Sequence, residues 1–143
     1  MEAQRQNSRH QDVVILGDVL DVMIAQARRE APLECCGLLT GRGGRVEQAV
    51  PMVNAAASAT RFEVAPADLF QFFRELRRSG QTLVGIYHSH PASPAVPSPR
   101  DVSEFHYPEA HCWIISLAQE PPSVRCWRWV RMGFREVNYR RED

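Results

Sequence analysis

Two histidines separated by a single residue stand at the end of an apolar run, in the stretch GIYHSHPASPAVPSPRD at residues 85–101. Residues two apart on a strand point to the same face, so His88 and His90 can converge on one ion while Ser89 points away. Imidazole nitrogens suit zinc, and a catalytic zinc site needs a third protein ligand and an open position for water. Asp101 can supply that ligand, because the chain between it and His90 is long enough to turn back over the strand end.

The segment that leads to Asp101 has two interpretations. Four prolines between residues 91 and 99 fix φ along it and reduce the entropy lost in closing a loop. The sequence SPRD at 98–101 is also close to a capping box, with Ser98 at N-cap, proline at N1 and an acidic residue at N3. Spacing alone leaves open a metal site, an ordinary helix start, or both at once.

Glu34 is the candidate for a base beside such a metal. It stands in APLECCGLLTG, directly before a CCGLL run that is apolar on both faces and is expected to be buried. A carboxylate there is either a solvated strand end or a site residue, and position alone favours the solvated end. The adjacent Cys35 and Cys36 are expected to pack in the core, because a fourth protein ligand would close the metal to water.

The composition excludes several classes of function. Seventeen basic and seventeen acidic residues give a net charge of zero, which predicts neither a nucleic-acid nor a membrane-surface partner. Every basic residue is arginine, so a lysine Schiff base and a phosphate-loop lysine are both excluded. No signal-peptide core or membrane span is found, which predicts a cytoplasmic protein whose four cysteines are reduced and mostly buried.

The pattern predicts a flexible tail at 1–12 and one domain at 13–143, built as a mixed α/β sandwich around one sheet. A helix is expected at 18–30 with Asp18 as its cap. A second is expected to start after Pro66 and stop at Gly80, with Leu69, Phe70, Phe73 and Leu76 on its apolar side. A short helix is expected at 98–107. Strands are expected at 35–40, 45–53, 82–90, 111–117, 123–130 and 134–139, with a short one in RFEV at 61–64.

Together these residues resemble the JAMM, or MPN-plus, metalloprotease family. Its pattern is a glutamate near the first strand, then H-[ST]-H-P, about six or seven residues, and S-x-x-D. The chain has Glu34, HSHP at 88–91, six residues, and SPRD at 98–101. The run from PLECCGLLTG to RFEV and a helix is also similar to small bacterial members. A zinc deaminase would need H-x-E and P-C-x-x-C, which are absent, as is H-E-x-x-H.

The resemblance implies a cytidine-deaminase-like α/β/α sandwich with a mixed central sheet, and one zinc ion per chain. His88, His90 and Asp101 would bind the zinc, with water as the fourth ligand. Glu34 would accept the proton of that water and pass it to the leaving amine, and Ser98 would donate a hydrogen bond to the oxyanion. The implied reaction is hydrolysis of the peptide or amide bond after the C-terminal Gly-Gly of a ubiquitin-like sulfur-carrier protein.

Two alternatives stay open at this stage. One is a non-catalytic interaction module of the same fold, although all five motif residues are present. The other is a DNA-repair-associated role, although those relatives carry asparagine where this chain has Ser89, and the neutral charge argues against nucleic acid. His106 and His111 are expected to be surface or structural residues, and Trp127 and Trp129 are expected to share a face and cover the core. The sequence also leaves open a homodimer.

Overall fold

The computed structural model describes residues 13–143, so the predicted tail at 1–12 lies outside the described residues. Its centre is an eight-stranded sheet with the strand order β7-β6-β5-β4-β2-β3-β1-β8. Three helices accompany the sheet in this part of the chain: α2 (Gly17–Glu30), α3 (Pro66–Ser79) and α4 (Pro99–Glu104). The strands are β1 (Val13–Leu16), β2 (Cys36–Arg42), β3 (Arg45–Met52), β4 (Thr82–His90), β5 (His111–Ser116), β6 (Ser123–Val130), β7 (Gly133–Val137) and β8 (Tyr139–Glu142). Within the same residues no helix combines the length and the hydropathy needed to span a membrane.

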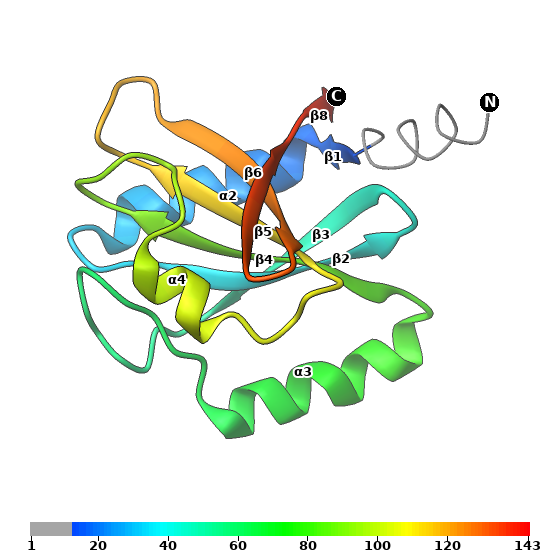
Figure 1. Cartoon of the computed structure of the whole chain (residues 1–143). Coiled ribbons are helices and arrows are strands. Elements are labelled where there is room, and N and C mark those ends of the chain that lie inside the picture. The colour runs from blue at the N-terminus through cyan, green and yellow to red at the C-terminus, as the bar shows by residue number, and fades with distance from the viewer. Residues whose placement is uncertain (1–12) are drawn as a thin grey trace.

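The sheet is mixed and has helices on both faces. The central strand β4 pairs antiparallel with β2 and parallel with β5. Helix α2 packs on one face, and α3 lies on the other (Figure 1). This arrangement confirms the predicted mixed α/β sandwich. The predicted hairpin of residues 35–40 and 45–53 is also confirmed, as the antiparallel pair β2 and β3.

Strand β4 separates the two cores and directs its last side chains. Tyr87 packs in the core under α2 with Met23, whereas Ile86 packs in the core under α3 with Phe72. Because side chains alternate along a strand, the two histidines that follow project on the same side as Ile86. Ser89 projects to the α2 side, where its hydroxyl accepts a hydrogen bond of 2.8 Å from the backbone N–H of Cys35.

The sheet curls so that its two ends approach each other. Strands β7 and β8 lie at opposite ends of the strand order, yet only Asn138 separates them along the chain. The segment 134–139, expected as one strand, is therefore divided between two strands, and residues 13–16 form a strand β1 that sequence reasoning missed. The Tyr139 hydroxyl donates a 2.6 Å hydrogen bond to the carbonyl of Val124 across the curl.

Both long helices form close to where the pattern places them. Helix α3 begins with Pro66 at its first turn and ends at Gly80, whose φ of 74° is the left-handed conformation that glycine favours. The prediction for its apolar side is wrong at Phe70, which is 69% exposed, because the buried position belongs to Phe72. Asp18 is not the cap of α2, since Leu16 occupies that position and makes no side-chain hydrogen bond there.

The predicted strand in RFEV is also wrong. Residues 61–64 adopt no regular strand, although they cross the face of the sheet that carries the histidines. Their alternating pattern has another cause, since Phe62 packs inward against the core under α3 while Arg61 and Glu63 are exposed.

Candidate metal centre

The C-terminal end of β4 brings the two predicted histidines together. The Nε2 atoms of His88 and His90 lie 3.2 Å apart, and both side chains are buried. The loop that follows carries the four prolines and returns to the start of α4. There the Asp101 Oδ2 atom lies 3.2 Å from each of the two Nε2 atoms. The structure thus brings together all three predicted ligands.

The helix cap and the candidate metal ligand coincide at the start of α4. The Ser98 hydroxyl accepts a 3.1 Å hydrogen bond from the backbone N–H of Asp101, and the Asp101 carboxylate accepts one of 2.9 Å from the N–H of Ser98. This is a complete capping box with proline at the first turn. The cap fixes the rotamer of Asp101, and the same oxygen that receives the Ser98 N–H faces the histidines.

The distances between the three donor atoms match those of a tetrahedral metal site. Zinc bonds of roughly 2.0–2.1 Å at tetrahedral angles separate neighbouring ligand atoms by about 3.3–3.4 Å. The three separations here are each 3.2 Å. Among the described residues, these three side chains are the group of histidine, cysteine and acidic residues whose donor atoms lie close enough to hold one ion.

The hydrogen bond at the second nitrogen of His90 shows which ring nitrogen carries the proton. The Nδ1 atom of His90 lies 2.8 Å from the carbonyl oxygen of Pro94, which can only accept, so Nδ1 carries a proton, and in the neutral ring Nε2 is the nitrogen that offers a lone pair to a metal. The Nδ1 atom of His88 is buried and has no hydrogen-bond partner within residues 13–143. The Phe62 ring stacks on the imidazole of His88 with centroids 4.7 Å apart, which fixes the plane of that ring.

Electrostatics at the site favour an anionic carboxylate beside the imidazoles. Burial raises the pKa of Asp101, but hydrogen bonds from His88 and His90 outweigh it and hold the pKa far below its usual range. Burial lowers the pKa of His90, while the hydrogen bonds to Asp101 and to the Pro94 carbonyl raise it more, so the net pKa is raised. An anionic carboxylate next to two imidazoles is an environment that favours a positive charge between them.

Glu34 lies on the same face as the ligands. Cys36 pairs with His88 in the antiparallel ladder, and continuing that register places Glu34 opposite His90. Glu34 is only 3% exposed, so its interpretation as a solvated strand end is wrong. Its Oε1 atom has no hydrogen-bond partner in the described part of the chain.

The environment of Glu34 makes it a weak acid. Burial raises its pKa from 4.5 to about 7, and the nearby positive charge of His90 only partly opposes this rise. A carboxyl group with a pKa near neutrality can both accept and return a proton at cellular pH, which is what general acid–base catalysis needs.

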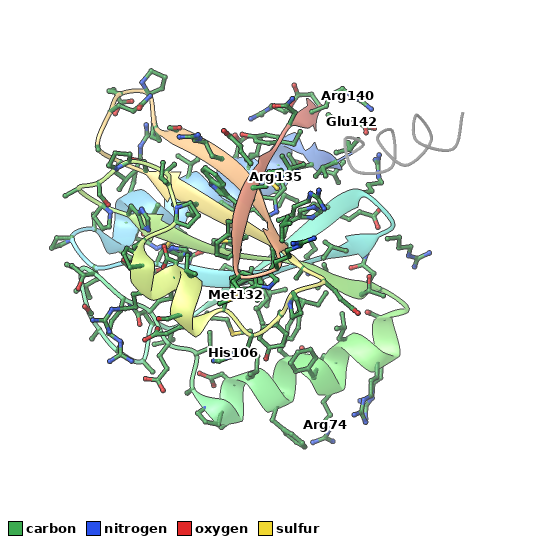
Figure 2. The ribbon with its side chains drawn as sticks, in the orientation of Figure 1. Arg74, His106, Met132, Arg135, Arg140 and Glu142 are labelled. Carbon is green, nitrogen blue, oxygen red and sulfur yellow. The ribbon has the colours of Figure 1, made fainter. Side chains whose placement is uncertain are left out.

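A hollow of about 360 Å³ opens beside the donor atoms. His88 and Asp101 form one wall, and the remaining walls are largely apolar. They come from β2, β4, α3 and the segments on either side, with Leu38, Phe62, Leu69, Ile86, Phe105 and Tyr107 among the lining residues. His106, which sequence reasoning treated as a surface or structural residue, also lines the hollow. It lies on the segment that follows α4, on the side of α3 (Figure 2).

The other predicted residues take structural positions. All four cysteines are buried and free, and burial raises the pKa of Cys35 to about 11 and that of Cys36 to about 12, so neither is a ready thiolate ligand. Trp127 is buried and donates a 3.1 Å hydrogen bond to the carbonyl of Ala95, which anchors the proline-rich loop. Trp129 stacks on Phe105.

Comparison with known proteins identifies the family. Residues 17–130 match the family described as prokaryotic homologs of the JAB domain, and the chain belongs to this family. The predicted membership of the JAMM/MPN group is thereby confirmed.

Named relatives cover most of the domain. The chain is 38% identical over 106 residues to the CysO-cysteine peptidase of Mycobacterium tuberculosis, which is 73% of each chain. It is 42% identical over 87 residues to a protein of Thermus thermophilus named probable TtuB-protein conjugate cleaving protease, which is 60% of this chain and 58% of that one. A protein of Desulfitobacterium hafniense, solved in solution, shares the fold with a TM-score of 0.83 at 31% identity, over 92% of this chain and 93% of the other.

Proposed function

We propose that this protein is a zinc-dependent peptidase or isopeptidase that hydrolyses the bond after the C-terminal Gly-Gly of a ubiquitin-like sulfur-carrier protein. The observation that carries the proposal is the set of three donor atoms, each 3.2 Å from the other two, beside a buried carboxylate oxygen that has no hydrogen-bond partner among residues 13–143. The names of the two relatives, which act on CysO-cysteine and on TtuB conjugates, support the substrate class.

The donor set suits one zinc ion. His88, His90 and Asp101 would hold it through two imidazole nitrogens and one carboxylate oxygen, a ligand set that leaves a fourth position open. Zinc bound there supplies Lewis acidity, which lowers the pKa of water and polarises a substrate carbonyl. The Pro94 carbonyl orients the imidazole of His90, and the Phe62 ring orients that of His88.

Glu34 and Ser98 take the two proton-handling roles in this proposal. The carboxylate of Glu34, with a pKa raised to about 7, accepts the proton of the attacking water and delivers it to the leaving amine. The Ser98 hydroxyl uses its lone pair to accept the Asp101 N–H, so its own proton remains available for the developing oxyanion. Each role uses a group that the fold already holds in place.

The apolar hollow gives an extended substrate tail a place beside the donor atoms. Glycines immediately before the scissile bond have no side chains, so a Gly-Gly tail can approach the buried Glu34 and His90 without steric conflict.

A cytoplasmic location and a homodimer stay predictions of the sequence.

The proposal is tested by incubating zinc-loaded protein with purified sulfur-carrier proteins that extend beyond Gly-Gly, followed by mass spectrometry. The carrier mass is expected to fall to that of the form ending in Gly-Gly. The matched control is Glu34→Gln, which should retain zinc and leave the carrier intact. An unchanged mass with zinc-loaded wild-type protein against several such carriers would refute the proposal.

A further inference from the structure

Asn54, which follows β3, has every hydrogen-bonding position of its side chain in use. The residue is 8% exposed. Its Nδ2 donates 3.0 Å hydrogen bonds to the carbonyls of Glu34 and Arg61. Its Oδ1 accepts from the N–H groups of Ala56 at 3.0 Å and Glu63 at 3.1 Å. A single buried amide therefore makes four hydrogen bonds to the backbone of two separate segments.

These two segments carry different parts of the proposed catalytic site. One bond reaches the backbone of Glu34, whose own N–H donates to the Ser58 carbonyl at 2.9 Å in the same loop. Two others hold Arg61 and Glu63, the residues on either side of Phe62. The Phe62 ring in turn stacks on His88. Asn54 thus links the backbone of the candidate base to the ring that orients one candidate ligand.

We propose that Asn54 is a positioning residue that holds Glu34 and the Phe62–His88 stack in a fixed relation to each other. This inference rests on the proposed function for its consequence in catalysis. Only a carboxamide supplies two donors and a doubly accepting oxygen at one point. An aspartate would lose both donors and would add a negative charge near Glu34, whose ionisation is already disfavoured by burial.

Gln26 provides a matched control on the opposite face of the sheet. It is also a buried amide, 0% exposed, and its Nε2 donates a 2.9 Å hydrogen bond to the carbonyl of Cys36 on β2. Its Oε1 accepts from the hydroxyl of Tyr87, the residue before His88. It therefore contacts the same two strands within two residues of Glu34 and His88, but it reaches neither Phe62 nor the loop at 54–64 through those bonds.

The test compares Asn54→Ala with Gln26→Ala by three measurements: thermal unfolding, zinc affinity from chelator competition, and hydrogen exchange of the Glu34 amide in the metal-free protein. Both variants are expected to lose a similar amount of stability. Asn54→Ala should raise the Kd for zinc about tenfold. That is the smallest effect typical of mutating residues that orient metal ligands. The same variant should also speed hydrogen exchange of the Glu34 amide. Gln26→Ala should change the zinc Kd by less than about twofold.

A double-mutant cycle with Phe62→Ala gives a sharper result. If Asn54 acts through the Phe62 ring, the double variant Asn54→Ala/Phe62→Ala should lose much less zinc-binding free energy than the sum of the two single losses. In the double variant Gln26→Ala/Phe62→Ala, the two losses should be additive. Equal zinc losses in Asn54→Ala and Gln26→Ala, or full additivity with Phe62→Ala, would overturn the inference. These readouts need no substrate, so a wild-type protein that binds zinc but cleaves no carrier would refute the proposed function and still decide the role of Asn54.

Discussion

Replacing the candidate base Glu34 by glutamine should weaken function and strengthen the metal-free fold. Glu34 is 3% exposed, and burial raises the pKa of its carboxyl group from 4.5 to about 7. A group that binds its proton more tightly in the folded state destabilises that state as pH rises above the unfolded pKa. The raised pKa corresponds to about 3 kcal/mol lost from the free energy of unfolding once the pH exceeds 7. Glutamine has the same shape and never ionises, so the Glu34→Gln variant does not incur this loss.

The assay is urea unfolding of the wild type and Glu34→Gln in excess chelator at about pH 4.5 and about pH 8. Between the two, the stability difference should move by about 2–3 kcal/mol in favour of the variant, because the penalty is nearly absent at the lower pH and complete at the higher. Any constant cost of the amide cancels in this comparison. As a control, Glu109→Gln removes an exposed carboxylate and should change the free energy by less than about 0.5 kcal/mol at either pH.

Loss of carrier cleavage by the same variant, with zinc content unchanged, would complete the result. A stability difference that stays constant within about 0.5 kcal/mol across this pH range would refute the reasoning, since it would mean that Glu34 ionises as easily in the folded protein as in the unfolded chain.

Three further predictions follow from the geometry. Ser98→Ala should lower kcat by about 100-fold and the free energy of unfolding by about 1 kcal/mol, because the hydroxyl serves both the oxyanion and the α4 cap; an unchanged kcat would contradict this role. Leu69→Trp, which narrows the hollow, should raise KM for the carrier at least about tenfold, and a wild-type KM would show that the tail lies elsewhere. Zinc affinity should fall as the pH drops through the raised pKa of His90, because the ion must displace that proton; chelator competition that gives the same Kd at about pH 8 and about pH 5.5 would contradict it.

The ligand set could be predicted from sequence because each of its members follows a local rule. The two-residue period of a strand places His88 and His90 on one face, and SPRD defines a helix start. In the structure both rules involve the same atom, Asp101 Oδ2. It accepts a hydrogen bond from the backbone N–H of Ser98 and also faces both imidazoles. One carboxylate oxygen therefore serves the helix cap and is also the predicted metal ligand.

The features that sequence reasoning missed depend on contacts between distant segments. Phe62 lies in an alternating run that is typical of a strand, yet its neighbours bond to the Asn54 side chain instead of a sheet partner. No local pattern marks Asn54, because its four backbone partners come from two separate segments of the chain.

Two errors in the elements have different physical causes. In α3, adjacent aromatic residues made the helical period ambiguous, so Phe70 was expected on the apolar side and Phe72 was not. The division of the last strand at Asn138 follows from the curl of the whole sheet. The curl brings the two edge strands, β7 and β8, close enough for a single residue to connect them.

The most direct test of the account is crystallography of the zinc-loaded protein with data collected on both sides of the zinc absorption edge. We expect a single anomalous peak bonded to His88 Nε2, His90 Nε2 and Asp101 Oδ2, with Glu34 beside it. A protein that carries no zinc peak at these three atoms, or one bound instead at the buried cysteines, would contradict the account.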